Sequence, residues 1–334
     1  MSLNFTELVA GGADYVQEAE PPFDEEAVWA ELVEGGAEEG WSHSLHSNTV
    51  YSVFERDGLV YSGGQDHRVR AVDASDGSEI WSHSLHSDYV HSVFERDGVV
   101  YSGSDDDTVK AVDASDQSEI WSHSLHSNSV YSVSYGGGVV YSASPDGTVK
   151  AVDASDGSEI WSHSLHTGGV VSVFERDGVV YSGSFDETVK AADASDGSEI
   201  WSHSLHSSQV NSVSYGDGVV YSGSNDETVK AVDASDGSEI WSHSLHTDNV
   251  QSVFARDGIV YSGSGDYTVK AADASDGSEI WSHPFHSDIV FSVFERDGVV
   301  YSGSQNGTVK AANILTDVNL RIGFDNKWLP MEGQ

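Results

Sequence analysis

Fourteen of the sixteen histidines recur every 40 residues, in two series that begin at His43 and His46. We call each such series of equivalent positions a column. Histidine ligates metals and acts as an acid or base near neutral pH, so both kinds of chemistry must be considered. A metal site needs three or four ligands around one ion, whereas the members of a column lie one structural unit apart. We therefore expect both columns to be structural, and we expect no metal site.

A recurrent acidic turn is a second candidate for ion binding. Its first copy, residues 73–79 (Asp-Ala-Ser-Asp-Gly-Ser-Glu), carries carboxylate and hydroxyl oxygens that could ligate calcium. Its spacing differs from that of a twelve-residue calcium loop, and Asp-Gly is a strong hairpin signal. We interpret the segment as a plain turn, with loose cation binding at high salt left open.

The sequence contains no recognisable catalytic motif. It has no cysteine, no nucleophile elbow, no phosphate-binding loop and no paired catalytic carboxylates. Near-identical repeats also argue against catalysis, because an active site needs unlike groups that converge at one point. The prediction is a protein that is not an enzyme and that needs no cofactor.

The charge of the chain is strongly one-sided, with 15 basic and 55 acidic residues and a formal net charge of −40. Such a surface repels itself unless salt shortens the screening length, which falls from about 10 Å at 0.1 M to about 3 Å at 1 M. We interpret the composition as halophilic, an adaptation to a salt-rich cytoplasm; the alternative is an acidic protein that is merely soluble. The same charge makes nucleic acid and anionic membranes poor partners.

The start of the chain, residues 1–20, lacks the basic and apolar regions of a secretory signal. No run approaches the 18 apolar residues that a membrane span needs. We therefore expect a cytoplasmic protein, and we expect it to be a monomer.

The elements that must position these residues form a unit of 40 residues. The copy at residues 166–205 contains four short runs rich in β-branched and aromatic residues, separated by turn signals such as Asp177-Gly178. Four strands of this length make one small antiparallel sheet, which would be marginal alone. Repeated around an axis, such sheets form a β-propeller. The unit is marked by a column of tryptophans, which we expect to be structural and to lie between blades: Trp41, Trp81, Trp121, Trp161, Trp201, Trp241 and Trp281.

Strand counting predicts the closure of the ring. The repeats occupy residues 41–313, beginning with a fourth strand at Trp41–Leu45 and ending with first to third strands at Val290–Asn313. The prediction is an all-β, seven-bladed propeller in which these terminal segments complete one blade. Residues 1–40 are predicted to be an N-terminal extension with a short helix at about 24–34, because Val28, Trp29, Leu32 and Val33 have helical spacing. Residues 314–334 are predicted to be a tail.

The repeats resemble two propeller families. The segment His206–Asp233 resembles the WD-repeat unit, in which a His, a Ser, an Asp and a Trp form a buried hydrogen-bonded tetrad. That resemblance implies structural hydrogen-bonded groups of three residues, or triads. One contains His46, Ser62 and Asp66, and another contains His206, Ser222 and Asp226. The fourth member of the tetrad is absent, because the Trp position of the second group holds Val232. The third and fourth strands, VKAVDASDGSEIW, resemble the quinoprotein-type repeat instead. This second resemblance keeps open an alternative, a quinoprotein-like enzyme.

Differences between the copies are concentrated in five columns. The column of Thr49 holds seven residue types in seven copies, and the columns of Asn48, Tyr51, Gln65 and His67 also vary. In an up-and-down blade, the link before the first strand and the link between the second and third strands lie at the same end. These columns should therefore share one face of the disc, which we name the loop face.

We predict that the loop face binds a protein or peptide, since loops on a rigid scaffold commonly carry recognition and aromatic residues anchor interfaces. Drift at exposed sites is the competing explanation, in a recently amplified array with no dedicated ligand. The predicted binding residues are Asn48, Thr49, Tyr51, Gln65, His67, Asp88, Tyr89, His91, Asp105, Asp107, Tyr131, Phe185, Glu187, Gln209, Asn211, Asn225, Asn249, Gln251, Tyr267, Ile289, Phe291 and Gln305.

Overall fold

The computed structural model describes residues 29–33, 36–315, 319–324 and 327–330. They fall into two compact units. The larger unit contains residues 36–315, and the smaller one contains the other described segments. The regular secondary structure of these segments consists of β-strands alone.

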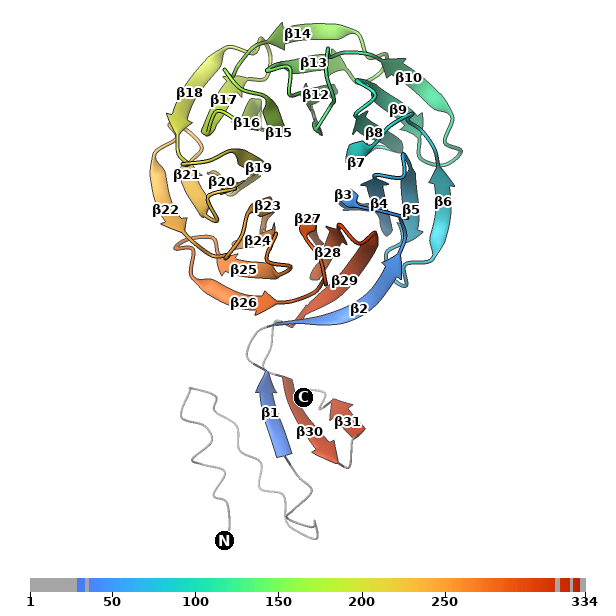
Figure 1. Cartoon of the computed structure of the whole chain (residues 1–334), viewed down its shortest axis with the longest axis vertical. Coiled ribbons are helices and arrows are strands. Elements are labelled where there is room, and N and C mark those ends of the chain that lie inside the picture. Colours follow the sequence, from blue (N-terminus) through green and yellow to red (C-terminus); the bar gives the residue numbers. More distant parts are fainter. Residues whose placement is uncertain (1–28, 34–35, 316–318, 325–326, 331–334) are drawn as a thin grey trace. The chain divides into compact units, whose positions relative to one another are not determined.

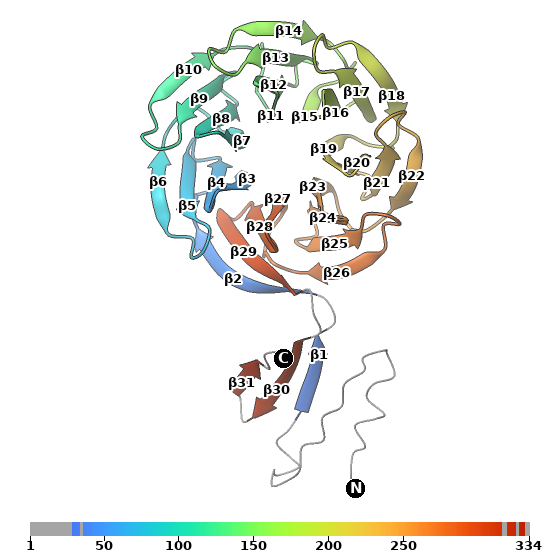
Figure 2. The ribbon, with the colours of Figure 1, turned by 180° about the vertical axis from the view of Figure 1, so that it is seen from behind.

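The larger unit is a seven-bladed β-propeller of four-stranded antiparallel sheets (Figures 1 and 2). In blades 1 to 6 the strands follow the chain from the axis to the rim. Blade 1 contains β3 (Val50–Arg56), β4 (Leu59–Gly64), β5 (Val69–Asp73) and β6 (Glu79–His83), and blade 2 contains β7 (Val90–Arg96), β8 (Val99–Ser104), β9 (Val109–Asp113) and β10 (Glu119–His123). Blade 3 contains β11 (Ser132–Gly136), β12 (Val139–Ala143), β13 (Val149–Asp153) and β14 (Glu159–His163), and blade 4 contains β15 (Val170–Arg176), β16 (Val179–Ser184), β17 (Thr188–Asp193) and β18 (Glu199–Ser204). Blade 5 contains β19 (Val210–Gly216), β20 (Val219–Ser224), β21 (Val229–Asp233) and β22 (Glu239–His243), and blade 6 contains β23 (Val250–Arg256), β24 (Ile259–Ser264), β25 (Val269–Asp273) and β26 (Glu279–His283).

Blade 7 is assembled from both ends of the repeat region, as predicted. Its strands, from the axis outward, are β27 (Val290–Arg296), β28 (Val299–Ser304), β29 (Thr308–Leu315) and β2 (Gly36–Ser44). β2 begins at Gly36 rather than Trp41, and β29 ends at Leu315 rather than Asn313, so this blade is longer than the repeat pattern indicates. Antiparallel pairing of β2 with β29 joins the first strand of the ring to the last.

The tryptophan column packs between neighbouring blades. Trp41, on β2 of blade 7, shares a buried cluster with Val50, Val53 and Val60 of blade 1. Its indole Nε1 donates to the carbonyl oxygen of Ala74 in blade 1 at 2.9 Å. Equivalent bonds of 2.9 to 3.0 Å start from Trp81, Trp121, Trp161, Trp201 and Trp241. Each of these indoles therefore fills a gap between blades and satisfies its one donor there.

A second connection between blades runs around the axis. The hydroxyl oxygen of Ser52 accepts a hydrogen bond from the backbone N–H of Val93 at 3.1 Å, and the next blades repeat this contact. The seven bonds form a closed circle, which we name the serine belt. Its other members are Ser92 to Val133, Ser132 to Val173, Ser172 to Val213, Ser212 to Val253, Ser252 to Val293 and Ser292 to Val53. All seven copies carry serine at this position.

The smaller unit contains a three-stranded antiparallel sheet, ordered β1 (Trp29–Val33), β30 (Asn319–Phe324) and β31 (Lys327–Pro330). The predicted helix is therefore wrong for residues 29–33; its other residues, 24–28 and 34, lie outside the described residues. The helical propensity of residues 29–33 is a weak preference, which strand pairing overrides. Their partner is β30, about 290 residues further along the chain. β30 pairs with β1 and β31 and belongs to none of the seven blades.

Candidate functional site

Each blade is fastened at the loop face by a buried histidine, as the WD-repeat resemblance implies. In blade 1, His46 is hydrogen-bonded through Nδ1 to Asp66 at 2.7 Å and through Nε2 to Ser62 at 2.8 Å. In blade 5, His206 makes the same contacts with Asp226 and Ser222. Both ring nitrogens of each histidine are used in these hydrogen bonds and are not available to ligate a metal ion. We therefore assign the groups a structural role.

A threonine completes these sets and was not recognised from the sequence. The hydroxyl of Thr188 lies 2.9 Å from Nδ1 of His166 and 2.5 Å from Asp186. The signal was available, because six of the seven copies carry Thr at this position and the first carries Arg68. Blade 7 departs in another way, because Asn306 replaces the aspartate. With burial and the nearby Lys310 charge but no carboxylate beside it, the pKa of His286 falls to about 3.

The carboxylates of these sets are held in the charged form. Burial alone would raise the pKa of Asp66, but hydrogen bonds and charge from His46 and Arg70 lower it to about 2. In blade 5, burial is likewise outweighed by hydrogen bonds from Thr228 and Ser207, and the pKa of Asp226 is about 2. These two aspartates are therefore ionised at neutral pH.

The two variable links lie against each other in most blades. The backbone N–H of Gln65 donates to the carbonyl oxygen of Thr49 at 2.8 Å, and that of Phe185 donates to Gly169 at 2.9 Å. Equivalent bonds occur in blades 2, 5, 6 and 7. The structure thus brings the columns of Thr49 and Gln65 together at one end of the blades.

The predicted binding residues differ in accessibility. The side chains of Thr49 and Asn211 are buried, and both are used within the loops: Thr49 donates to Gln65 at 3.1 Å, and Asn211 donates to Asn225 at 2.7 Å. The exposed members are Asn48, Phe185, Glu187, Tyr267 and Gln305. The remaining fifteen are half-buried.

Aromatic residues of neighbouring innermost strands meet near the axis. The rings of Tyr51 and His91 lie 4.5 Å apart between centroids, those of His91 and Tyr131 4.7 Å, and those of Tyr51 and Phe291 5.4 Å. Tyr89 lies 6.3 Å from Tyr51. These five residues, from blades 7, 1, 2 and 3, form what we name the aromatic arc. The sequence placed them on one face but did not show that they touch.

One carboxylate is built into the aromatic arc. Asp105 accepts a hydrogen bond from Nε2 of His91 at 2.7 Å. Burial alone would raise the pKa of Asp105, but hydrogen bonds from His91 and Ser129 hold it below its usual value. Burial, followed by the charge of Asp105, raises the pKa of both Tyr51 and Tyr131. A negative charge therefore stands beside neutral phenol rings.

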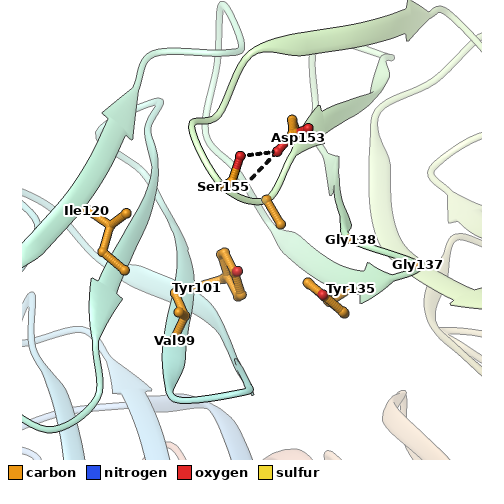
Figure 3. A pocket seen from close by; sticks show the side chains of 9 residues that line it. Val99, Tyr101, Ile120, Tyr135, Gly137, Gly138, Asp153 and Ser155 are labelled. Carbon is orange, nitrogen blue, oxygen red and sulfur yellow. Dashed lines mark hydrogen bonds between the residues drawn. The ribbon is translucent and has the colours of Figure 1, made fainter.

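The opposite face holds a groove between blades 2 and 3 that the sequence analysis missed (Figure 3). It encloses about 500 Å³, and its lining includes Tyr101, Ile120, Tyr135 and the hairpin glycines Gly137 and Gly138. Tyr101 and Tyr135 are stacked with centroids 5.7 Å apart. The third and fifth copies both have Ser-Tyr-Gly where four copies have Phe-Glu-Arg, and the third copy alone has a glycine, Gly137, where the other copies have aspartate.

The conformation of each acidic turn is held by hydrogen bonds between residues of the turn itself. The Asp73 carboxylate accepts from the backbone N–H and the hydroxyl of Ser75 at 2.8 and 2.5 Å, and Asp76 accepts from Ser78 at 2.9 Å. Gly77 supplies the positive φ of 72° that the turn requires. No group of three or more His, Asp or Glu in the described segments is arranged to hold a metal ion. These contacts account for the recurrent turn without an ion.

Blade number, strand order and closure define the chain as a seven-bladed propeller of repeated blades. Three overlapping segments, residues 26–165, 145–254 and 225–319, match the model of a PQQ-repeat family described as outer membrane protein assembly factor BamB. The chain belongs to this family, in agreement with the quinoprotein-type resemblance of its third and fourth strands.

Among solved structures, the chain is similar to the crystal structure of the computationally designed Ika8 protein. The TM-score is 0.68 at 25% sequence identity, over 83% of this chain and 99% of that one. No curated protein sequence matches the chain. No helix in the segments that the structure describes is long and apolar enough to cross a membrane.

Proposed function

We propose that this propeller is a non-catalytic scaffold that recognises a protein or peptide through the loop face. The observation that carries the proposal is the aromatic arc, in which Tyr51, Tyr89, His91, Tyr131 and Phe291 meet at variable positions of otherwise uniform repeats. Aromatic residues that are half-buried on a rigid support supply contact area at low entropic cost, as interface anchors do.

Backbone geometry gives independent support. Glu187 and Tyr267 adopt left-handed φ values of 69° and 71° in the link between the second and third strands, where blades 3 and 7 have Gly147 and Gly307. A bulky residue in this region costs free energy that glycine avoids. The side chain of Tyr267 is nevertheless 45% exposed, so its packing within the propeller does not compensate for the unfavourable backbone conformation.

We infer that the protein acts as a monomer in a salt-rich cytoplasm. The formal net charge of −40 supports this, since the repulsion is screened only at high ionic strength. On this basis binding should be measured in about 1 M KCl, where the screening length is about 3 Å and non-specific attraction of basic proteins is weak.

Selection from a displayed dodecapeptide library tests the proposal. We expect wild-type protein to enrich peptides that a loop-face variant, Tyr89→Ser with Phe185→Ser, Tyr267→Ser and Phe291→Ser, no longer binds. A matched control instead replaces four rim isoleucines with serine, at Ile160, Ile200, Ile240 and Ile280, whose exposure is close to that of Phe185 and Tyr267. Thermal unfolding of both variants checks their folds.

Three outcomes would contradict the proposal. Enriched peptides that bind the loop-face variant as well as wild type would show that another surface binds them. Peptides lost only in the rim control would point to the outermost strands. No enrichment by any form of the protein would favour an amplified array without a dedicated ligand.

A further inference from the structure

The aromatic arc is negatively charged on one side, and no lysine or arginine whose side chain the structure describes is paired with it. Asp105 lies at its centre, hydrogen-bonded to His91, with 23% of its side chain exposed. Asp88, next to Tyr89, is 50% exposed and lies 4.0 Å from the ring nitrogen of His67. Both carboxylates are therefore reachable from solvent beside the rings.

The lysines and arginines of the propeller are engaged elsewhere. Every lysine whose side chain the structure describes pairs with a glutamate of an outermost strand, as Lys190 does with Glu199 at 2.7 Å. Most described arginines lie in the hairpins of the opposite face, where Arg296 approaches Glu55 at 3.8 Å. Arg68, on the loop face, donates to Ser82 on the outermost strand β6.

We propose that the aromatic arc and Asp105 form a subsite for a positively charged side chain, lysine or arginine, of the partner. The inference rests on the proposed function and specifies the chemistry of its ligand. A cation over the face of a tyrosine ring is attracted by the ring quadrupole, and a neighbouring carboxylate adds a direct charge interaction. Neutral phenols and an ionised aspartate are the protonation states that this recognition needs.

The other half of the same ring of innermost strands cannot serve in this way. There the equivalent positions are Val171, Asn211 and Gln251, and Asn211 is already bonded to Asn225 and to the carbonyl oxygen of Val250. The subsite is therefore confined to blades 7, 1, 2 and 3. A partner should insert its cation off the axis, on the aromatic side.

Two matched libraries test the subsite. One displays random dodecapeptides that include Lys and Arg, and the other carries Gln in place of both. In about 1 M KCl, where long-range attraction is screened, we expect enrichment from the first library alone. In each selected peptide, Arg→citrulline or Lys→acetyl-lysine substitution should weaken binding about tenfold or more.

Variants of the protein locate the effect. Tyr131→Leu should weaken binding by about 2-fold to 30-fold, the range of a cation–π contact, whereas Tyr131→Phe should retain it because the ring face remains. Asp105→Asn should also weaken binding. The control, Asp116→Asn, removes the same charge from an exposed turn and should change nothing. Unfolding temperatures confirm that each variant is folded.

The outcomes separate this inference from the proposed function. Peptides from the neutral library that bind well, and lose binding in the four-residue loop-face variant, would overturn the cationic subsite and keep the recognition face. An equal loss in Asp105→Asn and Asp116→Asn would also overturn the subsite, because diffuse charge would explain it. No enrichment from either library would overturn both.

Discussion

The hydroxyl oxygen of Ser292 accepts a hydrogen bond from the backbone N–H of Val53 at 3.0 Å, across 239 residues of sequence. This bond closes the serine belt and joins blade 7 to blade 1. At the rim, β2 is paired with β29 as the outermost strand of blade 7, and the chain then continues into β3 of blade 1. The ring is therefore closed twice, once at the axis by a side chain and once at the rim by strand pairing. Neither closure depends on a covalent link, since the chain has no cysteine.

Removal of one belt hydroxyl should destabilise the whole propeller. Ser292→Ala leaves the buried N–H of Val53 without a partner, which costs about 1–3 kcal/mol. Ser172→Ala, at an interior step of the belt, should cost a similar amount because it removes an equivalent 3.0 Å bond to Val213. Urea unfolding measures both. Ser42→Ala, at an exposed position, is the control; a loss no larger than this control would show that water replaces the hydroxyl.

The tryptophan column should dominate the stability of the interfaces between blades. Trp161→Ala removes a buried indole, 7% exposed, and its bond to Ala194, and should cost about 3–5 kcal/mol. The adjacent Ile160 is 49% exposed, so Ile160→Ala should change the free energy of unfolding by less than about 0.5 kcal/mol. Chemical denaturation gives both values. Similar losses in the two variants would contradict the packing role assigned to the indole.

The aspartates of the triads should make stability depend on acid pH. The pKa of Asp226 is about 2 in the folded protein, below its ordinary value of 3.8. Its contribution is therefore present above about pH 4 and is lost as the pH falls toward 2, a difference of about 2 kcal/mol. The side chain is 10% exposed, so screening by solvent reduces this only modestly.

Asp226→Asn isolates that contribution, and blade 7 shows that the substitution fits. There Asn306 accepts hydrogen bonds from the backbone and hydroxyl of Thr308 at 3.1 and 2.6 Å, as Asp226 does from Thr228 in blade 5. The variant should be less stable than wild type at pH 7, and the gap should close between pH 4 and pH 2. Urea titrations across that range measure it; a constant gap would mean that the carboxylate charge is not involved.

The repeat fold could be predicted because its determinants are local and recur. A tryptophan every 40 residues, Asp-Gly turns and four short apolar runs specify the blade, and counting strands specifies the closure. The strand at Trp29–Val33 could not be predicted in this way, since its partner β30 is remote and the apolar residues between 28 and 33 also fit a helix.

The candidate site was only partly predictable for a related reason. Variation between the copies identified the loop face. It could not distinguish buried residues that hydrogen-bond within the loops, such as Thr49 and Asn211, from accessible residues such as Phe185. The aromatic arc depends on contacts between strands 40 residues apart, which column comparison does not measure. The groove beside Tyr135 could not be predicted, because a smaller side chain at a hairpin of the third copy does not show whether neighbouring blades leave a space there.

The last prediction concerns coupling between adjacent blades at the opposite face. A Cβ atom on Gly136 in blade 3 would meet the carboxylate of Glu175 in blade 4, whereas one on Gly216 in blade 5 would lie 3.2 Å from Cβ of Ala255 in blade 6. Glycine in the third copy is thus matched to a glutamate in the fourth. Gly136→Ala would displace this carboxylate, which accepts a hydrogen bond from the backbone N–H of Gly178 at 2.9 Å, and should cost about 1–3 kcal/mol.

A double-mutant cycle tests this coupling. Glu175→Ala reproduces the pairing at Gly216 and Ala255, so Gly136→Ala should be far less costly in that background. Gly216→Ala serves as the control and should be milder than Gly136→Ala, because a methyl group rather than a carboxylate faces it. Urea unfolding of the four proteins gives the interaction energy. Additive effects would show that Glu175 moves aside freely, and the close approach would then not constrain the choice of residue at position 136.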